Sequence, residues 1–486
     1  MSWSDLGTIA PVIAAILVAA AVLIVDLAMP GRRELVIATA LGGLAIVALI
    51  VFFQAGRTQT AFGGAYSLDN LSVFLDMLFV AIAALTILFA VDYLEPRGLP
   101  IAEFCAVLIF AVTGAMLIAA STDLLLLFIA LELMVLPGYM LAGYARHDAY
   151  ATEGAIKYFL LGSFSSAILL FGLAYVWGLT GSTRVSDVTA VLAADVAKGA
   201  IPAGLAMGLA FMSAGVAFKM AAVPFHYWTP DAYQGSPTPV TAYLSVGPKV
   251  GAFAIALRLF VGALAPVKAD WLPIVIVLAA ATMTLGNLIA ITQDNVKRML
   301  AYSSIAHTGY MLVGLAAYAG GQTSGLSAIL FYGTAYTFMN MGAFAIIVAL
   351  QRTPGVSSQI STFAGLGRRD PWLGLLMVVF LLSLTGIPPL AGFWAKAYVI
   401  LAAVQAGGWL TALAVLAMVN AAAAAFYYLR VVVYMYMRDP VDDEAASNPG
   451  LLFRAGLAVT GIVTLVFGLF PAILTAATNA ANVFHG

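Results

Sequence analysis

The amino-acid sequence predicts an all-α polytopic membrane protein with about 14 transmembrane helices. Of its 486 residues, 63% are hydrophobic and only 9% are charged, whereas charged residues make up about 25% of a soluble domain. The apolar residues gather in runs close to the roughly 20 residues that a helix needs to cross a bilayer. The loops between these runs are short, so we expect no separate soluble domain.

Apolar runs locate the expected helices in chain order. The first run, 9–25, is longer than most signal-peptide cores and follows no basic segment, so we expect a spanning helix and not a cleaved signal. The longest expected loops are 180–201, 351–371 and 435–451. The expected helices lie near 9–28, 35–53, 70–90, 102–120, 123–143, 155–179, 202–223, 238–263, 272–291, 299–318, 326–350, 372–403, 409–434 and 452–478.

Two of these helices are expected to be broken. The segment FKMAAVPFHYWTPDAY contains Pro224, and LTGIPPLAGFWAKAY contains Gly386, Pro388 and Pro389. Proline removes a backbone donor and clashes one turn back, so such breaks occur at membrane depth only where the freed groups face protein or water. One broken helix in each half of a chain is typical of transporters built from inverted repeats.

Basic residues in the loops indicate the orientation of the chain, because cytoplasmic loops are enriched in Lys and Arg. An even number of helices with the N-terminus outside gives ten basic residues inside and four outside, so we expect both termini on the outer side. The inner loops carry Arg32, Arg33, Arg97, Arg146, Lys297, Arg298, Arg352, Arg368, Arg369 and Arg438, and the outer loops carry Arg57, Arg184, Lys198 and Lys268.

Four ionisable residues fall inside expected spanning helices: Glu132, Lys219, Lys249 and Lys396. An ionised side chain at the bilayer centre costs about 2.5–3.5 kcal/mol on insertion scales. The default interpretation of such residues is a path for ions or protons. Lys249 is the deepest, since it lies about 16 Å into its helix at 1.5 Å per residue. The alternative for Lys249 is a purely structural pair with a carboxylate.

Glu132 and Lys219 are expected to act on each other. Two unit charges 4 Å apart attract by about 4 kcal/mol at an effective dielectric of 20. A buried lysine beside Glu132 would therefore keep its proton and would lose it when Glu132 moves away. A static buried ion pair is the alternative.

Lys396, His307 and Lys157 are the other candidates for proton transfer. Lys396 follows a helix break, where water can reach it. His307 lies in SSIAHTGYMLVGL and can relay protons near neutral pH, although a neutral core histidine bonded to Ser or Thr fits the same pattern. Lys157 lies nearer a helix end, and a side chain there can extend to the interface.

Composition excludes several kinds of site. Cys105 is the single cysteine, so the chain forms no internal disulfide and lacks the roughly four cysteines of an iron–sulfur site. The four histidines fall in different segments, with no pair suited to haem, and no glycine-rich phosphate loop follows a strand. A net charge of -1 gives no indication of nucleic-acid binding. If the chain serves a redox enzyme, the redox chemistry lies on other chains.

Three segments resemble the antiporter-like membrane subunits of respiratory complex I: FKMAAVPFHYWTPDAYQGSPTPVTAYLSVGPKVGAF, NVKRMLAYSSIAHTGYML and SLTGIPPLAGFWAKAYVI. The resemblance covers nearly the whole chain. It is greatest for the N type, whose pattern is similar to TPDAYQGSPTPVTAYL. The L type has a long C-terminal lateral helix, and the M type usually has a glutamate where this chain has Lys396.

The resemblance implies both an architecture and roles for residues. Helices 4–8 and 9–13 would form two inverted repeats, which divides the chain into 1–101, 102–265, 266–435 and 436–486. Glu132 would modulate a lysine, and protons would pass along Lys219, Lys249, His307 and Lys396.

The resemblance also implies a function. The chain would be a proton-translocating, non-redox subunit of NADH:quinone oxidoreductase in a bacterial inner membrane, with NADH, FMN, iron–sulfur clusters and quinone bound by other subunits. Its partners would be lipid, another antiporter-like subunit and small membrane subunits, with no nucleic acid. A subunit of a multisubunit Na+/H+ antiporter and a structural, non-pumping membrane-arm subunit remain as alternatives.

Overall fold

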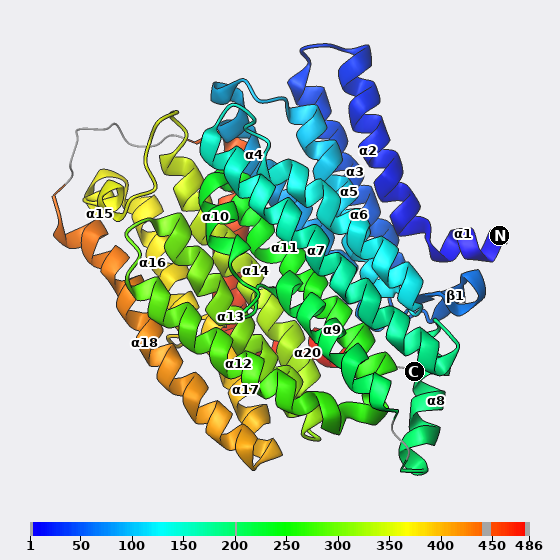
Figure 1. The fold of residues 1–486 in the computed structure, drawn as a ribbon. Helices are drawn as coiled ribbons and strands as arrows, with labels where there is room; N and C mark the ends of the chain where they lie inside the picture. The colour runs from blue at the N-terminus through cyan, green and yellow to red at the C-terminus, as the bar shows by residue number, and fades with distance from the viewer. Residues whose placement is uncertain (1–2, 200–201, 440–448, 482–486) are drawn as a thin grey trace.

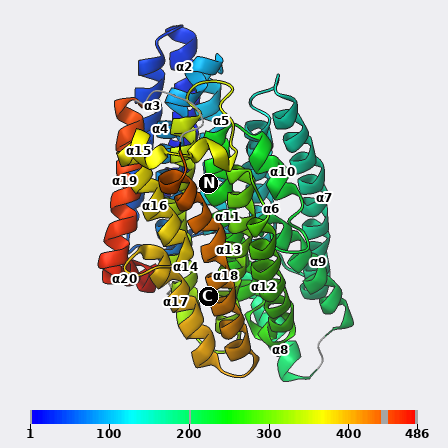
Figure 2. The same ribbon diagram turned by 90° about the vertical axis from the view of Figure 1, so that its left-hand side faces the viewer.

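The chain folds into one bundle of long helices that lie roughly side by side (Figures 1 and 2). The computed structural model describes residues 3–199, 202–439 and 449–481. Within these residues, 12 helices are long and apolar enough to cross a membrane, and two shorter apolar helices form one further crossing. The more polar helix α13 (Val296–Ala319) completes the predicted set of fourteen, since its 24 residues also suffice to span a bilayer.

The helix bounds follow the predicted ranges closely. The other spanning helices are α2 (Ala10–Ala28), α3 (Arg33–Gln54), α4 (Asn70–Leu94), α5 (Ile101–Ala120), α6 (Leu124–Ala142), α7 (Ala149–Thr180), α9 (Ala203–Met220), α11 (Thr238–Ala256), α12 (Lys268–Ile291), α14 (Ser324–Leu350), α16 (Pro371–Thr385) with α17 (Ala391–Ala406), α18 (Trp409–Met437) and α19 (Leu451–Leu469).

Several short elements lie where the sequence analysis expects only loops. The predicted loop 180–201 contains α8, and the antiparallel strands β1 and β2 pair Gln59 with Leu68. The single helix predicted for 452–478 is wrong, because the chain turns at Phe470 and a new helix starts at Pro471. Most of the predicted loop 435–451 lies outside the described residues. The short elements are α1 (Trp3–Thr8), β1 (Gln59–Ala61), β2 (Tyr66–Leu68), α8 (Val185–Ala197), α10 (Trp228–Gly235), α15 (Leu366–Arg369) and α20 (Pro471–Ala481).

Both predicted helix breaks are present. Helix α9 ends at Met220, followed by Ala221 in the left-handed region, and the chain resumes as α10 after Pro224. Helix α16 ends before Gly386, which has a φ of 92°, and α17 begins beyond the two prolines. In each run of five helices, α5 to α11 and α12 to α18, the broken helix is the fourth crossing.

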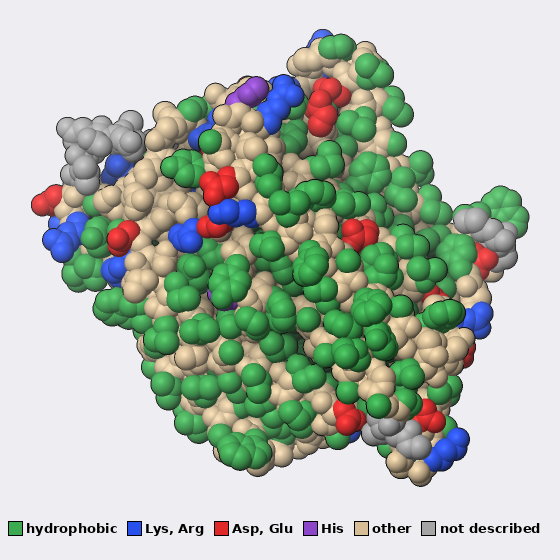
Figure 3. Space-filling view, viewed as in Figure 1, with side chains coloured by type: hydrophobic (Ala, Val, Ile, Leu, Met, Phe, Trp, Pro, Cys, Tyr) green, Lys and Arg blue, Asp and Glu red, His purple; other side chains and the backbone are tan. Residues whose placement is uncertain are grey.

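The outer surface is largely apolar, and the polar residues lie inside. Hydrophobic side chains cover most of the face in Figure 3, and charged side chains gather mainly towards its margins. Exposed apolar residues such as Phe53 and Phe164 suit contact with lipid, which has no polar groups to satisfy. By contrast α11 is buried along its entire length, beside α13 and α14 in both views. The core that surrounds α11 therefore encloses the polar residues considered next.

Candidate functional site: a line of buried polar groups

Lys219 lies in the last turn of α9, immediately before the first helix break, and is only 6% exposed. Its Nζ donates to the hydroxyl of Ser166 at 2.8 Å and to the carbonyl of Gly162 at 3.1 Å, both on α7. The carboxyl end of a helix carries a partial negative charge that favours a cation in its last turn. The break thus places Lys219 where a helix end and two neutral acceptors can stabilise its ammonium.

Glu132 does not form the predicted direct ion pair with Lys219. It lies midway along α6, is partly exposed, and its buried Oε1 has no hydrogen-bond partner. The two side chains are nevertheless close enough for the carboxylate to act electrostatically on Lys219. In this state of the protein the lysine is held by Ser166 and Gly162, and Glu132 remains available for a different pairing.

Lys249 is 2% exposed in the centre of α11, as its depth in the sequence predicted. Its Nζ donates to the hydroxyl of Ser304 at 2.5 Å and to the carbonyl of the same residue. In the described part of the chain no carboxylate forms an ion pair with it, so the structural pair considered as an alternative is absent. The preceding Pro248 cannot donate to the carbonyl of Leu244, which instead accepts from the Tyr233 hydroxyl at 3.0 Å.

The end of α9 and Lys249 are joined through α13. The Thr308 hydroxyl lies 2.8 Å from the carbonyl of Met220, the residue after Lys219, and 3.3 Å from the Ser304 carbonyl. That carbonyl also accepts from Lys249. One helix face therefore contacts the surroundings of both lysines.

His307 lies on α13 one turn after Ser304 and is 1% exposed. Both of its ring nitrogens have hydrogen-bond partners. Nδ1 lies 2.7 Å from the Tyr332 hydroxyl, and Nε2 lies 3.2 Å from the Tyr428 hydroxyl. A neutral imidazole can donate at one nitrogen and accept at the other, and tyrosine hydroxyls can do both. The partners of His307 are thus two tyrosines and not the Ser or Thr of the structural alternative, and this arrangement can pass a proton across the ring.

Two more tyrosines fill the space on either side of His307. The Tyr336 ring centre lies 4.8 Å from the imidazole centre and 5.7 Å from Lys249 Nζ. The Tyr310 ring centre lies 5.9 Å from the imidazole and 5.0 Å from Lys396 Nζ. Each tyrosine thus lies between His307 and one of the lysines.

Lys396 lies on α17 just beyond the second break and is 5% exposed. Its Nζ donates to the carbonyls of Leu384 and Thr385 at 3.0 and 2.7 Å. These are final carbonyls of α16, which have no partner within their own helix. In both broken helices a buried lysine therefore lies at the carboxyl end of the segment before the break. Lys219 belongs to that segment itself, whereas Lys396 belongs to the segment after the break.

Lys157 lies apart from this line. Its side chain is 42% exposed and pairs with Glu153 at 2.6 Å and with Asp231 at 2.8 Å. Asp231 also pairs with Arg298 at 2.7 Å. The structure thus places Lys157 in a partly exposed charge network at the start of α7.

Sequence reasoning did not single out the hydroxyl groups of the line. They come from Ser166, Ser304, Thr308, Tyr310, Tyr332, Tyr336 and Tyr428. A pattern that could have identified them is present in SSIAHTGY, where Ser304, His307 and Thr308 share one helix face at spacings of three and four. Tyr332 and Tyr336 are four residues apart on α14 and likewise lie on one helix face.

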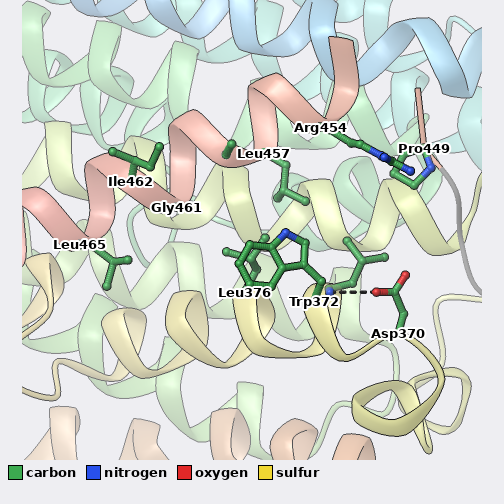
Figure 4. A pocket seen from close by; sticks show the side chains of 11 residues that line it. Asp370, Trp372, Leu376, Pro449, Arg454, Leu457, Gly461, Ile462 and Leu465 are labelled. Carbon is green, nitrogen blue, oxygen red and sulfur yellow. Dashed lines mark hydrogen bonds between the residues drawn. The ribbon is translucent and has the colours of Figure 1, made fainter. Parts of the chain in front are cut away.

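A cavity of about 580 Å³ lies between α16 and α19, away from this line (Figure 4). Its walls are mainly apolar, with Leu376, Leu457 and Ile462 along its length and Asp370 and Arg454 near one end. None of the buried lysines lines it. Among the described residues, no three His, Cys, Asp or Glu side chains form a group that could hold a metal ion.

Known proteins match this chain over most of its length. The family model for the transmembrane region of NADH:quinone oxidoreductase and Mrp antiporters matches residues 121–420. NADH-quinone oxidoreductase subunit N of Trichlorobacter lovleyi is 40% identical, and the match covers 97% of this chain and 95% of that protein. Subunit N of Chloroflexus aggregans is also 40% identical, over 99% of this chain and 98% of the relative.

Solved structures agree with this assignment. A chain of respiratory complex I from Thermus thermophilus with bound aureothin matches with a TM-score of 0.79 at 32% identity, covering 97% of this chain and 99% of that one. A chain of the Mrp complex from Dietzia sp. has the same TM-score at 23% identity, covering 99% and 97%, and shares the fold. This chain therefore belongs to the NADH:quinone oxidoreductase/Mrp antiporter family, and within it to the subunit N group of NADH-quinone oxidoreductase.

Proposed function

We propose that this chain translocates protons in the membrane arm of a bacterial NADH-quinone oxidoreductase, along the line from Glu132 and Lys219 through Lys249 and His307 to Lys396. The observation that carries the proposal is the set of three buried lysines that donate to hydroxyls and carbonyls. A lysine held by neutral acceptors keeps its proton less firmly than one paired with a carboxylate, because the pair's Coulomb attraction is missing.

The connecting groups suit proton transfer. Hydroxyls and a neutral imidazole can each donate one proton and accept another, so a chain of them moves a proton without moving a heavy atom far. Tyr336 and Tyr310 lie on the two sides of His307, facing Lys249 and Lys396. A proton on Lys249 would thus reach Lys396 through the imidazole and small rotations of these side chains, or through water that enters between them.

Glu132 would set the direction of the first step. Its free Oε1 lies within electrostatic range of Lys219. When the carboxylate approaches, the ammonium of Lys219 is stabilised, and when it withdraws the proton is released towards Lys249.

The remaining parts of the reaction belong to other subunits in this proposal. NADH, FMN, iron–sulfur clusters and quinone would bind to those subunits, and electron transfer there would supply the energy. The chain would sit in the bacterial inner membrane with both termini outside, next to another antiporter-like subunit and small membrane subunits. Lys157 would contribute through its charge network and not as a carrier in the line.

The test is NADH-driven acidification of inverted membrane vesicles from strains with Lys249→Ala or Lys249→Arg, beside NADH oxidation and a blue-native gel for assembly. Arginine keeps the charge but does not release its proton in a protein. Both variants should assemble and lose acidification and coupled oxidation. Lys268→Ala removes an exposed lysine at the start of α12 and should behave as the wild type.

Two outcomes would contradict the proposal. Assembled Lys249→Ala complex with wild-type acidification would make the buried lysines structural. Sodium-dependent acidification that persists without NADH oxidation would instead favour an Mrp-type antiporter, whose fold this chain shares.

A further inference from the structure

A second group of buried ionisable residues lies outside the lysine line, at the start of α4. Asp76 is 1% exposed, and neither of its carboxyl oxygens has a hydrogen-bond partner. Seven residues earlier, Asp69 caps the same helix by accepting from the amide of Ser72 at 2.8 Å. A spacing of seven places both carboxyls on one face of α4, about 10 Å apart along the axis at 1.5 Å per residue.

One guanidinium acts electrostatically on both acids but pairs with only one of them. Arg258 forms a bidentate ion pair with Asp69, at 2.7 Å from Nη1 to Oδ2 and 2.9 Å from Nη2 to Oδ1. Its Nε also donates to the carbonyl of Ala119 at 2.8 Å. Arg258 and Asp69 are the charged groups that act electrostatically on Asp76, and Arg258 attracts its carboxylate form while Asp69 repels it.

The charges of this group balance only with one added proton. Arg258 supplies one positive charge against two buried carboxyls, so one of them must be protonated for neutrality. An unpaired carboxylate costs more to bury than a paired one. Asp76 has no partner, whereas Asp69 pairs with Arg258, so the added proton belongs on Asp76. The nearby Tyr66 hydroxyl is also buried without a partner, and of the charged groups around it Asp76 acts on it most strongly.

The backbone that carries Arg258 is unusual. Residues Leu257–Ala263 form a π-helical segment that continues α11, and such segments are rare and frequent at functional sites. Lys249 lies nine residues earlier on the same continuous helix, about 13 Å away along the axis. Lys249 and Arg258 therefore stand on one continuous helical segment.

We propose that Asp76 is a further proton-binding residue of this chain, and that Asp76 and Asp69 exchange one proton as Arg258 pairs with one or the other. When the guanidinium turns from Asp69 to Asp76, an O–H bond breaks at Asp76 and one forms at Asp69, with water carrying the proton between them. Each state keeps one cation, one carboxylate and one neutral acid. The link of this exchange to turnover depends on the proposed function, whereas the protonation of Asp76 does not.

The experiment is redox-difference infrared spectroscopy on the complete complex, in H2O and D2O, with Asp76→Asn, Asp76→Glu and the control Glu103→Gln. The control removes an exposed carboxyl from the adjacent helix α5. In the wild type we expect a protonated-carboxyl C=O band that shifts in D2O. Asp76→Asn should lose that band and slow NADH-driven acidification at least fivefold, Asp76→Glu should restore both in part, and the control should change neither.

The results separate this inference from the proposed function. Redox-difference spectra of Asp76→Asn and wild type that agree in the carboxyl region would overturn the exchange of a proton at Asp76. A lost band with wild-type acidification would overturn its role in turnover. If Lys249→Ala keeps wild-type pumping while the Asp76 band is present, the lysine line fails and the protonated Asp76 stands.

Discussion

Each buried lysine of the line has acceptors that carry no full charge. Lys219 is held by a hydroxyl and a carbonyl, Lys249 by both oxygens of Ser304, and Lys396 by two carbonyls at a helix end. A carboxylate partner would fix the proton, and removing one member of such a pair costs about 3–5 kcal/mol. Neutral acceptors stabilise the ammonium less, so the cost of losing the proton is smaller. This is the physical property that a proton carrier needs.

Ser304→Ala tests this argument at Lys249. The variant removes the hydroxyl acceptor but keeps the Ser304 backbone carbonyl, so the ammonium loses one of its two hydrogen bonds. A hydrogen bond to a charged group contributes about 1.5–3 kcal/mol, which corresponds to a rate change of roughly tenfold or more. We expect NADH-driven acidification to fall by about tenfold while the complex assembles. Ser327→Ala, in the first turn of α14, is the control that should retain the wild-type rate.

Tyr336→Phe tests the connection between Lys249 and His307. The Tyr336 hydroxyl forms no hydrogen bond of ordinary geometry, although the Ser304 side chain acts on it, so its loss should change stability little. If the hydroxyl passes protons, acidification should fall several-fold with normal assembly on a blue-native gel. The half-buried Tyr318, on α13, gives the matched control Tyr318→Phe. Equal rates in both variants would remove Tyr336 from the line.

Charged residues and hydroxyls differ in how visible they are in the sequence. Glu132 and Lys249 stand out because a charge is costly among apolar residues, and their helices were located correctly. Glu132 was predicted to act on Lys219 and lies within electrostatic range of it, but the sequence does not show that Ser166 and Gly162 accept the hydrogen bonds of the lysine. Serines and tyrosines are common in membrane helices, so Ser166 and Tyr336 become candidates only when the packing is known.

At the scale of elements, the broken helices convert backbone into binding groups. The last carbonyls of α16 have no partners within the helix, and Lys396 takes two of them. Gly386 makes this possible, because it adopts a φ of 92° and a Cβ at this position would lie 2.9 Å from Lys396 Cδ. The turn residue and the lysine therefore act as one unit.

Gly386→Ala should displace Lys396. An L-residue in the left-handed region costs about 1–2 kcal/mol, and here the new methyl group also pushes on the lysine side chain. Gly181→Ala is a matched control, since Gly181 ends α7 in the same left-handed region with a φ of 72°, but nothing lies within 4 Å of an added Cβ. Both variants should lower thermal stability slightly, and Gly386→Ala alone should reduce acidification by an order of magnitude. A similar loss of acidification in the two variants would show that strain alone is responsible.

The sequence predicts best those elements that are determined by a few neighbouring residues. Proline clusters predicted both breaks, and apolar runs predicted the spanning helices. The amphipathic helix α8 and the hairpin β1–β2 were missed because they are short and outside the apolar runs. The turn at Phe470 was missed because the apolar composition continues on both sides of it. Pro471, which suits the first position of a new helix, was the signal that could have revealed it.

In the whole molecule, the line connects the two five-helix halves. Lys219 belongs to the first half and Lys396 to the second, and Lys249 lies in the helix that ends the first half. Helix α13 of the second half contacts the end of α9 through Thr308 and holds Lys249 through Ser304. The halves thus share one internal line of polar groups, and in the proposed mechanism a proton passes along all of it.

A path in series predicts non-additive effects. Lys219→Ala and Lys396→Ala should each reduce acidification strongly, but the double variant should be no slower than the slower single variant, because one interrupted step already limits the flow. Independent sites would instead give a product of the two effects, since free-energy changes at distant positions usually add. The two lysines lie in different helices and donate to different residues, so direct coupling does not complicate the comparison. Acidification rates normalised to assembled complex measure the difference. Two separate proton routes through the two halves would leave much of the acidification in each single variant and abolish it only in the double variant, and that pattern would contradict a path in series.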